Sequence, residues 1–190
     1  LRARGLIAIN LRDDDRLNWV MWSDGNKDIM ISTRDGKCVR FDERHVRPMG
    51  RNAAGVNAIT LREGDAIVAT AVVDKDDKRD LLVVSEKGLG KRTPLSEYPA
   101  KGRATQGVIT LNVTDKTGPV VGVQVVEPDD EVMCITSAGV LIRVPVEGIR
   151  QTGRNAQGVK VVSPTEGAVV SAVTKVVRYA AESPGDIAGS

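Results

Sequence analysis

The 190-residue chain repeats itself, and this repetition limits its fold more than any other feature does. The segment 28–36, Asp-Ile-Met-Ile-Ser-Thr-Arg-Asp-Gly, returns in similar form at 80–88 and at 131–139, at offsets of 52 and 51 residues. Four residues after the last glycine of each copy comes an arginine, and ten residues further on comes a Gly-Arg pair followed by Gly-Val. Self-similarity at a fixed period of this length is the sequence signature of propellers and solenoids.

Each repeat contains four short apolar segments separated by turn residues. In the first repeat, segments 28–32 and 37–41 flank the turn 33–36, alternating apolar residues follow within 56–61, and a valine-rich run occupies 67–73. Short apolar runs bounded by glycine and polar residues are typical of strands, and no stretch shows helical periodicity over a helix length. Four strands in 51 or 52 residues match one propeller blade. We therefore predict an all-β, propeller-like fold of four-stranded blades.

The chain holds about three and a half of these repeats. The predicted boundaries are 1–27 for the second half of a repeat, 28–79, 80–130 and 131–178 for three full repeats, and 179–190 for a flexible tail. Because the sequence starts without an initiator methionine or a signal peptide, we expect it to be part of a larger protein.

Composition narrows the function classes. The 27 Lys and Arg residues barely exceed the 25 Asp and Glu residues, so net charge alone does not indicate nucleic-acid binding. The five aromatic residues do not recur with the repeat, which argues against the stacking surfaces of proteins that bind single strands or RNA. A protein that binds duplex DNA regardless of sequence needs Lys and Arg spaced along a path.

The repeat supplies such spacing, because an arginine that recurs once per blade forms an arc of charge around the axis of the blades. The first candidates for DNA contact are the Gly-Arg arginines, Arg51, Arg103 and Arg154. The next are the arginines near the ends of the second strands, Arg40, Arg92 and Arg143. Neighbours that could extend the track are Lys37, Arg47, Lys91, Lys101, Arg150 and Lys160. The alternative is a structural role, in which arginine binds backbone carbonyls and glycine takes a left-handed conformation.

Nothing in the sequence indicates catalysis or metal binding. Cys38 and Cys134 lie in apolar strand-like segments at non-equivalent positions, so we expect buried, unbonded thiols. His45 has no counterpart in the other repeats, and the acidic run 13–15 falls in a turn, where consecutive side chains point in different directions. We expect no catalytic residue, metal site or cofactor in this chain.

Three blocks carry a resemblance to a known family. They are Arg-Pro-Met-Gly-Arg-Asn-Ala-Ala-Gly-Val at 47–56, Lys-Arg-Thr-Pro-Leu-Ser-Glu-Tyr-Pro-Ala-Lys-Gly-Arg at 91–103, and Gly-Arg-Asn-Ala-Gln-Gly-Val at 153–159. Over residues 1–178 the chain resembles the C-terminal domain of DNA gyrase A, with the equivalent domain of topoisomerase IV as the weaker match. The resemblance implies the C-terminal portion of a β-pinwheel of about six blades. The Gln-Arg-Arg-Gly-Gly-Lys-Gly heptapeptide of gyrase is absent here, and degenerate copies end at Gly55, Gly107 and Gly158.

The resemblance also implies a function. This chain would be a non-catalytic module of a type IIA DNA topoisomerase that binds and bends duplex DNA and supports ATP-dependent negative supercoiling by the holoenzyme, with ATP and Mg on other domains. Its partners would be duplex DNA, the remainder of gyrase A and the whole of gyrase B, in the bacterial cytoplasm and without membrane contact. The alternatives are the equivalent domain of topoisomerase IV and a propeller-like protein-interaction module. We expect weak, sequence-independent affinity for duplex DNA and a modest bend without a full handed wrap.

Overall fold

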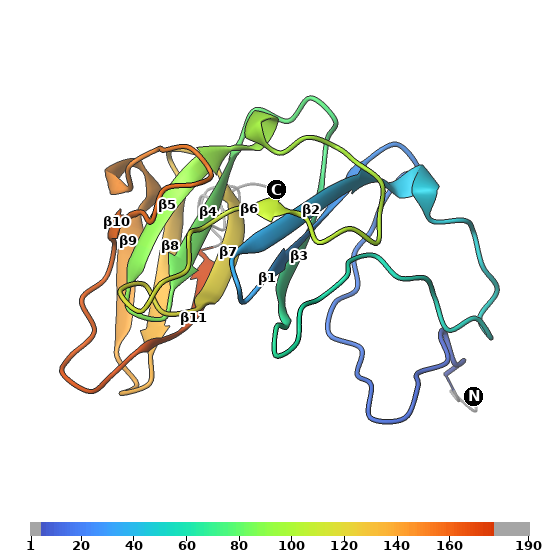
Figure 1. The fold of residues 1–190 in the computed structure, drawn as a ribbon, viewed down its shortest axis with the longest axis horizontal. Coiled ribbons are helices and arrows are strands. Elements are labelled where there is room, and N and C mark those ends of the chain that lie inside the picture. The colour runs from blue at the N-terminus through green and yellow to red at the C-terminus, as the bar shows by residue number, and fades with distance from the viewer. Residues whose placement is uncertain (1–4, 177–190) are drawn as a thin grey trace, which may run out of the picture.

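The computed structural model describes residues 5–176, and this part of the chain consists of short antiparallel strands joined by long loops (Figure 1). The strands are β1 (Asp28–Thr33), β2 (Lys37–Asp42), β3 (Ile67–Val73), β4 (Asp80–Ser85), β5 (Leu89–Pro94), β6 (Val108–Ile109), β7 (Val120–Val126), β8 (Glu131–Thr136), β9 (Leu141–Pro145), β10 (Val159–Lys160) and β11 (Val170–Lys175). Within 5–176 the helical elements are three short 3-10 turns, η1 (Glu43–His45), η2 (Leu95–Glu97) and η3 (Val146–Gly148). The predicted all-β class is confirmed, and no helix in the described range is long and apolar enough to span a membrane.

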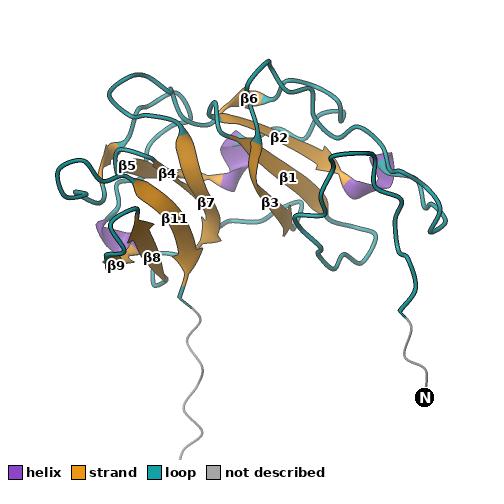
Figure 2. Cartoon of the chain, turned by 90° about the horizontal axis from the view of Figure 1, so that it is seen from below, coloured by secondary structure: helices purple, strands orange, loops and turns teal. Residues whose placement is uncertain are grey.

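The strands form three antiparallel sheets, which we call blades 1 to 3. Blade 1 has the strand order β3-β1-β2-β6, blade 2 has β10-β5-β4-β7, and blade 3 has β11-β8-β9. The blades lie side by side in an arc, and the strands β3, β7 and β11 neighbour one another along it (Figures 1 and 2). The predicted tail, 179–190, lies outside the described residues.

One part of the predicted blade is wrong, because the third segment of each repeat does not join the blade of its own repeat. β6 belongs to the second repeat but pairs with β2 of the first, and β10 of the third repeat pairs with β5 of the second. The corresponding segment of the first repeat, 56–61, forms only an isolated bridge between Ile59 and Thr105. Apolar alternation indicates that a segment is extended, but it does not specify the hairpin with which that segment pairs.

The hydrophobic core lies between neighbouring blades. Alternation along β4 sends Leu81 and Val83 toward blade 1 and Leu82 and Val84 toward blade 3, so this strand is buried on both faces. The first cluster contains Cys38 and the second contains Cys134. Both thiols are free and buried, and burial raises the pKa of each to about 11.

Candidate nucleic-acid interface

Two of the three Gly-Arg pairs lie in loops that lead into the outer strands of the blades. The loop with Arg103 leads into β6 at the edge of blade 1, and the loop with Arg154 leads into β10 at the edge of blade 2. The glycine before each outer strand, Gly107 or Gly158, has a positive φ, and a Cβ there would lie 2.5 Å from a carbonyl oxygen of β2 or β5. Only glycine combines this backbone conformation with so close an approach. The repeated sequence therefore places one arginine beside each covered edge.

Arg103 and Arg154 bind backbone carbonyls at equivalent places. Arg103 donates from Nη1 to the Asn57 carbonyl at 2.8 Å and from Nε to the His45 carbonyl at 3.0 Å. Arg154 donates from Nη1 to the Ile109 carbonyl at 3.3 Å. Both side chains are half-buried, which matches the structural alternative. Neither forms an ion pair with a described acidic residue, so each keeps its charge and the remaining N–H groups at the outer edge.

Arg51 is the exposed member of the set. Within residues 5–176 its side chain has no hydrogen bond or ion pair. The carbonyls that hold Arg103 and Arg154 belong to equivalent segments of the preceding repeats. The corresponding segment 5–11 contacts the Arg51 loop through Asn10, but none of its carbonyls accepts a hydrogen bond from the Arg51 side chain. Its guanidinium is therefore the most available of the three for a phosphate.

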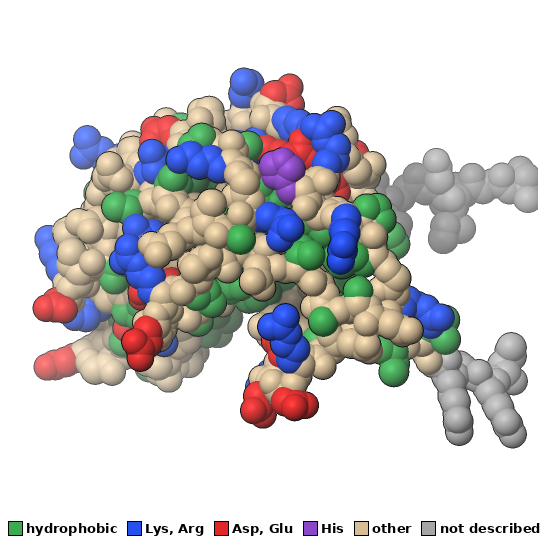
Figure 3. All heavy atoms as spheres, turned by 45° about the vertical axis from the view of Figure 1, so that its right-hand side comes forward, with side chains coloured by type: hydrophobic (Ala, Val, Ile, Leu, Met, Phe, Trp, Pro, Cys, Tyr) green, Lys and Arg blue, Asp and Glu red, His purple; other side chains and the backbone are tan. Residues whose placement is uncertain are grey.

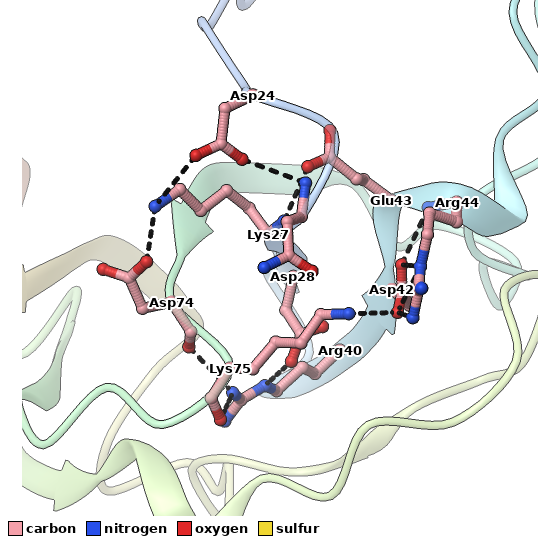
Figure 4. A network of polar contacts seen from close by, with 10 residues as sticks. Asp24, Lys27, Asp28, Arg40, Asp42, Glu43, Arg44, Asp74 and Lys75 are labelled. Atoms are coloured by element: carbon pink, nitrogen blue, oxygen red, sulfur yellow. Dashed lines mark hydrogen bonds and ion pairs between the residues drawn. The ribbon is translucent and has the colours of Figure 1, made fainter.

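Arg40 is enclosed by the protein, and its side chain is only 6% exposed. Its Nε donates to Asp28 Oδ2 at 2.7 Å, and Nη1 donates to the carbonyl of Leu95 in η2 at 2.9 Å. Nη2 donates to the carbonyls of Asp74 and Lys75, as part of the polar network in Figure 4. We therefore correct the sequence interpretation, because Arg40 ties blade 1 to the next blade and offers no guanidinium at the surface.

The other two arginines of this set become progressively more exposed along the chain. Arg92 pairs with Asp80 at 3.0 Å and donates to the carbonyl of Ile149 at 2.8 Å, so it too links its blade to the following one. Arg143 pairs with Glu131, and its side chain is 54% exposed because no blade follows within the described residues. Only Arg143 of this set is freely accessible.

Sequence reasoning missed the acidic partners of these arginines. An acid stands 12 residues before each of them, as Asp28, Asp80 and Glu131. This second periodic charge was visible in the repeat, and opposite charges that recur together at a fixed distance indicate an ion pair across a hairpin.

Lys91 is also not a surface residue, although its place beside Arg92 in the basic segment 91–103 suggested DNA contact. Its side chain is fully buried, and Nζ donates to the carbonyls of Gly153 and Arg154. Burial lowers the pKa of Lys91 to about 8. Lys91 therefore holds the third Gly-Arg loop against blade 2, and this placement corrects the interpretation of Lys91 as a phosphate contact.

The remaining predicted cations reach the surface. Lys101, Lys160, Arg47 and Arg150 are exposed, and Lys37 is half-buried at the edge of β2. Figure 3 shows the single histidine, in purple, surrounded by several Lys and Arg side chains on one face. This exposed residue, His45, lines a shallow hollow with Arg103, where the Arg103 loop meets η1. Among residues 5–176, no group of His, Cys, Asp or Glu is arranged to hold a metal ion, and the acidic run 13–15 is exposed.

Comparison with known proteins adds independent information. A family model described as the DNA gyrase C-terminal domain, beta-propeller, matches residues 2–21, 27–74, 79–127 and 130–176. The DNA gyrase A protein of Staphylococcus epidermidis is 44% identical over 176 residues, which cover 93% of this chain and 20% of the relative. The DNA gyrase A protein of Deinococcus deserti is 49% identical over 176 residues, which cover 90% of this chain and 22% of the relative. The chain thus spans about a fifth of the length of these relatives.

Two solved structures share the arrangement of the strands. The C-terminal domain of DNA gyrase A has a TM-score of 0.76 at 27% identity, with 91% of this chain and 58% of that chain covered. The C-terminal domain of DNA topoisomerase IV has a TM-score of 0.82 at 29% identity, with 89% of this chain and 52% of that chain covered. The arc of blades is therefore also present in two related solved domains.

Proposed function

The chain belongs to the DNA gyrase C-terminal domain family, and on that premise we propose that it binds duplex DNA along the outer edges of its blades and bends it. One observation carries the proposal: a Gly-Arg loop recurs in each repeat, and in the two described joints it places an arginine without an acidic partner beside the outer strand. Duplex DNA carries about one negative charge per 1.7 Å of its axis, so regularly spaced cations can follow it without reading bases.

The proposed DNA track is narrower than the sequence indicated. It consists of Arg51, Arg103, Arg154, Lys37, Lys101 and Lys160, with Arg47, Arg150 and Arg143 beside it. Arg40, Arg92 and Lys91 are left out, because the first two bind the next blade and Lys91 is fully buried. These three residues support the track by holding the blades and the third loop in place.

A curved track accounts for bending as well as binding. Bending 20–30 base pairs by 40–90° costs about 1–6 kcal/mol, which several phosphate contacts along the arc can offset. An arc of three blades contacts a shorter length of DNA than an arc of more blades would. We therefore propose a modest bend and no constrained handed wrap.

The wider role follows from the relatives. Their names favour gyrase over topoisomerase IV as the parent, with the rest of gyrase A and the whole of gyrase B as partners in the bacterial cytoplasm. Cleavage, ATP hydrolysis and their Mg would belong to other parts of that assembly, and this chain alone would perform none of them.

Charge reversal tests the proposal. We expect the variant Arg51→Glu, Lys101→Glu, Lys160→Glu to lose most of its affinity for a fluorescent duplex, equally for two unrelated sequences. The matched control Arg34→Glu, Arg62→Glu, Lys116→Glu changes the net charge by the same amount with exposed residues that are not part of the Gly-Arg loops or the outer strands, and it should keep most of its affinity. Equal losses of affinity in the two variants would refute the outer-edge track. If the chain bound a protein ligand and showed no DNA binding at low salt, a protein-interaction module would be favoured instead.

A further inference from the structure

Two joints of the arc differ at one residue beside the Gly-Arg loop. The first joint brings the loop 102–104 against blade 1, and the second brings the loop 153–155 against blade 2. In the repeat, His45 of the η1 turn corresponds to Glu97 of the η2 turn, 52 residues later. Both joints lie wholly within residues 5–176, so the surroundings of the two loops can be compared directly.

In the second joint the loop holds a carboxylate of the protein itself. Glu97 Oε2 accepts the backbone N–H of Arg154 at 3.2 Å, and a Cβ built on Gly153 would lie 3.6 Å from the same oxygen. Burial lowers the pKa of Lys91, which donates to the carbonyls of this loop, to about 8, and the charge of Glu97 opposes this shift. Backbone N–H groups and cationic side chains are the groups that bind phosphate oxygens. The second loop therefore has an anion site, which Glu97 fills.

In the first joint no described carboxylate takes this place. The backbone N–H groups of Gly102 and Arg103 donate to no acceptor among residues 5–176. The two acids nearest to His45 along the chain, Asp42 and Glu43, are held elsewhere. The carboxylate of Asp42 pairs with Arg44 and Lys75, and Glu43 accepts the backbone N–H of Lys27, as Figure 4 shows.

The first loop also has a more open conformation than the second. The carbonyl of Gly153 accepts the N–H of Ala156 at 3.3 Å, which closes a turn, whereas the carbonyl of Gly102 accepts from no described donor. Ala104 has a φ of +60°, a left-handed conformation that the corresponding Asn155 does not adopt. Strained backbone of this kind is concentrated at binding and active sites.

The open loop and the histidine enclose a shallow hollow of about 440 Å³, whose lining residues are His45, Gly102, Arg103 and Ala104. Arg103 uses Nε and Nη1 to bind carbonyls, which leaves its Nη2 without a described partner. An imidazole carries at least one N–H donor in either protonation state. Several Lys and Arg side chains surround this histidine on the surface (Figure 3). The hollow thus offers N–H donors and positive charge, and none of its lining residues is acidic.

We propose that this hollow binds one phosphate group of a DNA duplex, at the place where the second joint holds the carboxylate of Glu97. The proposal rests on the duplex binding proposed above and adds His45 to the phosphate contacts. It also makes the Gly-Arg loops unequal, because Glu97 competes with a phosphate at the Arg154 loop and no described carboxylate competes at the Arg103 loop. The phosphate would accept hydrogen bonds from the open loop, from the Arg103 guanidinium and from the His45 ring.

Nuclear magnetic resonance of the untagged 190-residue chain tests the site directly. The chain has one histidine, so the ring Hε1 signal belongs to His45 alone. A short duplex is added in steps, and fluorescence anisotropy of the same mixtures measures the bound fraction. We expect the signal to shift in proportion to that fraction. A signal that stays in place while anisotropy shows saturation would overturn the phosphate site and leave duplex binding intact.

Exchange of the two residues provides a second test. His45→Glu gives the first joint the carboxylate of the second, and it should weaken duplex binding and reduce the salt slope by about 0.9, the value for one phosphate. Ala138→Glu adds the same side chain at an exposed turn between β8 and β9 and should keep the slope. Glu97→His removes the carboxylate from the second loop and should increase the slope, whereas Glu63→His, at another exposed turn, should not.

The possible failures can be told apart. Equal slopes for His45→Glu and Ala138→Glu would overturn the phosphate site, and so would equal slopes for Glu97→His and Glu63→His. Circular dichroism checks that each variant is folded, and if His45→Glu is not, the histidine signal of the unmodified chain and the Glu97→His pair decide. An unmodified chain that binds no duplex at low salt would overturn the site together with the proposed function, whereas the other outcomes overturn the site alone.

Discussion

Arg40 and Arg143 occupy the same position in two repeats and differ in almost every contact. Each pairs with an acid 12 residues earlier, but the Arg40 side chain is 6% exposed and the Arg143 side chain is 54% exposed. Arg40 also reaches the η2 turn of the next blade, whereas no described blade follows Arg143. The ion pair is thus a property of the hairpin, and burial is a property of the joint between blades.

The same difference separates a loop at a joint between two blades from the loop at the end of the arc. Arg103 is tied to two carbonyls beside blade 1, whereas Arg51 has no partner among the described residues. Gly107 lies in close contact with β2, where a Cβ would meet a carbonyl oxygen, whereas a Cβ at Gly55 would meet nothing within 4 Å. The uncovered ends therefore show what the surfaces of a blade are like before a neighbour covers them.

The largest expected effect on the free energy of unfolding comes from replacing Arg40, with Arg143 as the comparison. Arg40→Met leaves Asp28 buried without its partner, and breaking a buried pair in this way costs about 3–5 kcal/mol. Arg143→Met removes an exposed pair and should cost about 0–1 kcal/mol. Urea unfolding of both variants checks this, and equal costs would show that the joint does not set the difference.

A second pair of variants makes the same comparison, between a covered and an uncovered position, at two glycines. Gly55→Ala and Gly107→Ala both place a side chain at positive φ, which costs about 1–2 kcal/mol. Gly107→Ala should cost a further ~1–3 kcal/mol, because its Cβ would meet a carbonyl oxygen of β2 that cannot move away freely. Thermal unfolding measures both changes, and a Gly55 variant as unstable as the Gly107 variant would mean that segment 55–59 is already packed.

A smaller effect should follow from Lys91, which stands where the other two repeats have Val39 and Ile142. Burial lowers its pKa to about 8 in the folded chain, below about 10.4 in an unfolded one. Between these pH values the unfolded state binds more protons, so the stability contributed by Lys91 increases as pH rises from about 8 to about 10.4.

The test of Lys91 compares wild type with Lys91→Met in urea across this pH range. The difference in unfolding free energy should shift in favour of wild type as pH rises and stay flat below about 8. The buried thiols lose stability at alkaline pH in both proteins, so their effect cancels in the difference. Parallel pH curves for the two proteins would show that burial does not lower the pKa of Lys91 in the folded chain.

Much of the fold could be predicted from the period, because hairpins and their turns are local. The turn glycines Gly36 and Gly88 and the alternation along β4 all lie where the repeat indicated. The exchange of outer strands could not be predicted, since β6 pairs with a hairpin about 70 residues earlier and alternation alone does not identify it.

The candidate site was less predictable, because the repeat locates an arginine without specifying its surroundings. Arg51 was among the first candidates for phosphate contact and Arg40 among the next, and the sequence did not show that Arg40 is enclosed while Arg51 is exposed. Lys91 lies in a block of basic residues but is buried against the third Gly-Arg loop. Burial of such residues depends on which blade follows, and that information is not local.

The central claim is that exposed cations along the outer edge hold DNA through its phosphates, and a salt titration of duplex affinity tests it most directly. We expect log K to fall linearly with log salt by about 0.9 per phosphate neutralised, with the same slope for two unrelated sequences. Arg51→Gln should reduce this slope by about one contact, while substitution of Arg62, an exposed arginine that is not part of a Gly-Arg loop, by Gln should leave the slope unchanged. A slope near zero, a slope that depends on sequence, or equal effects of the two substitutions would contradict the account.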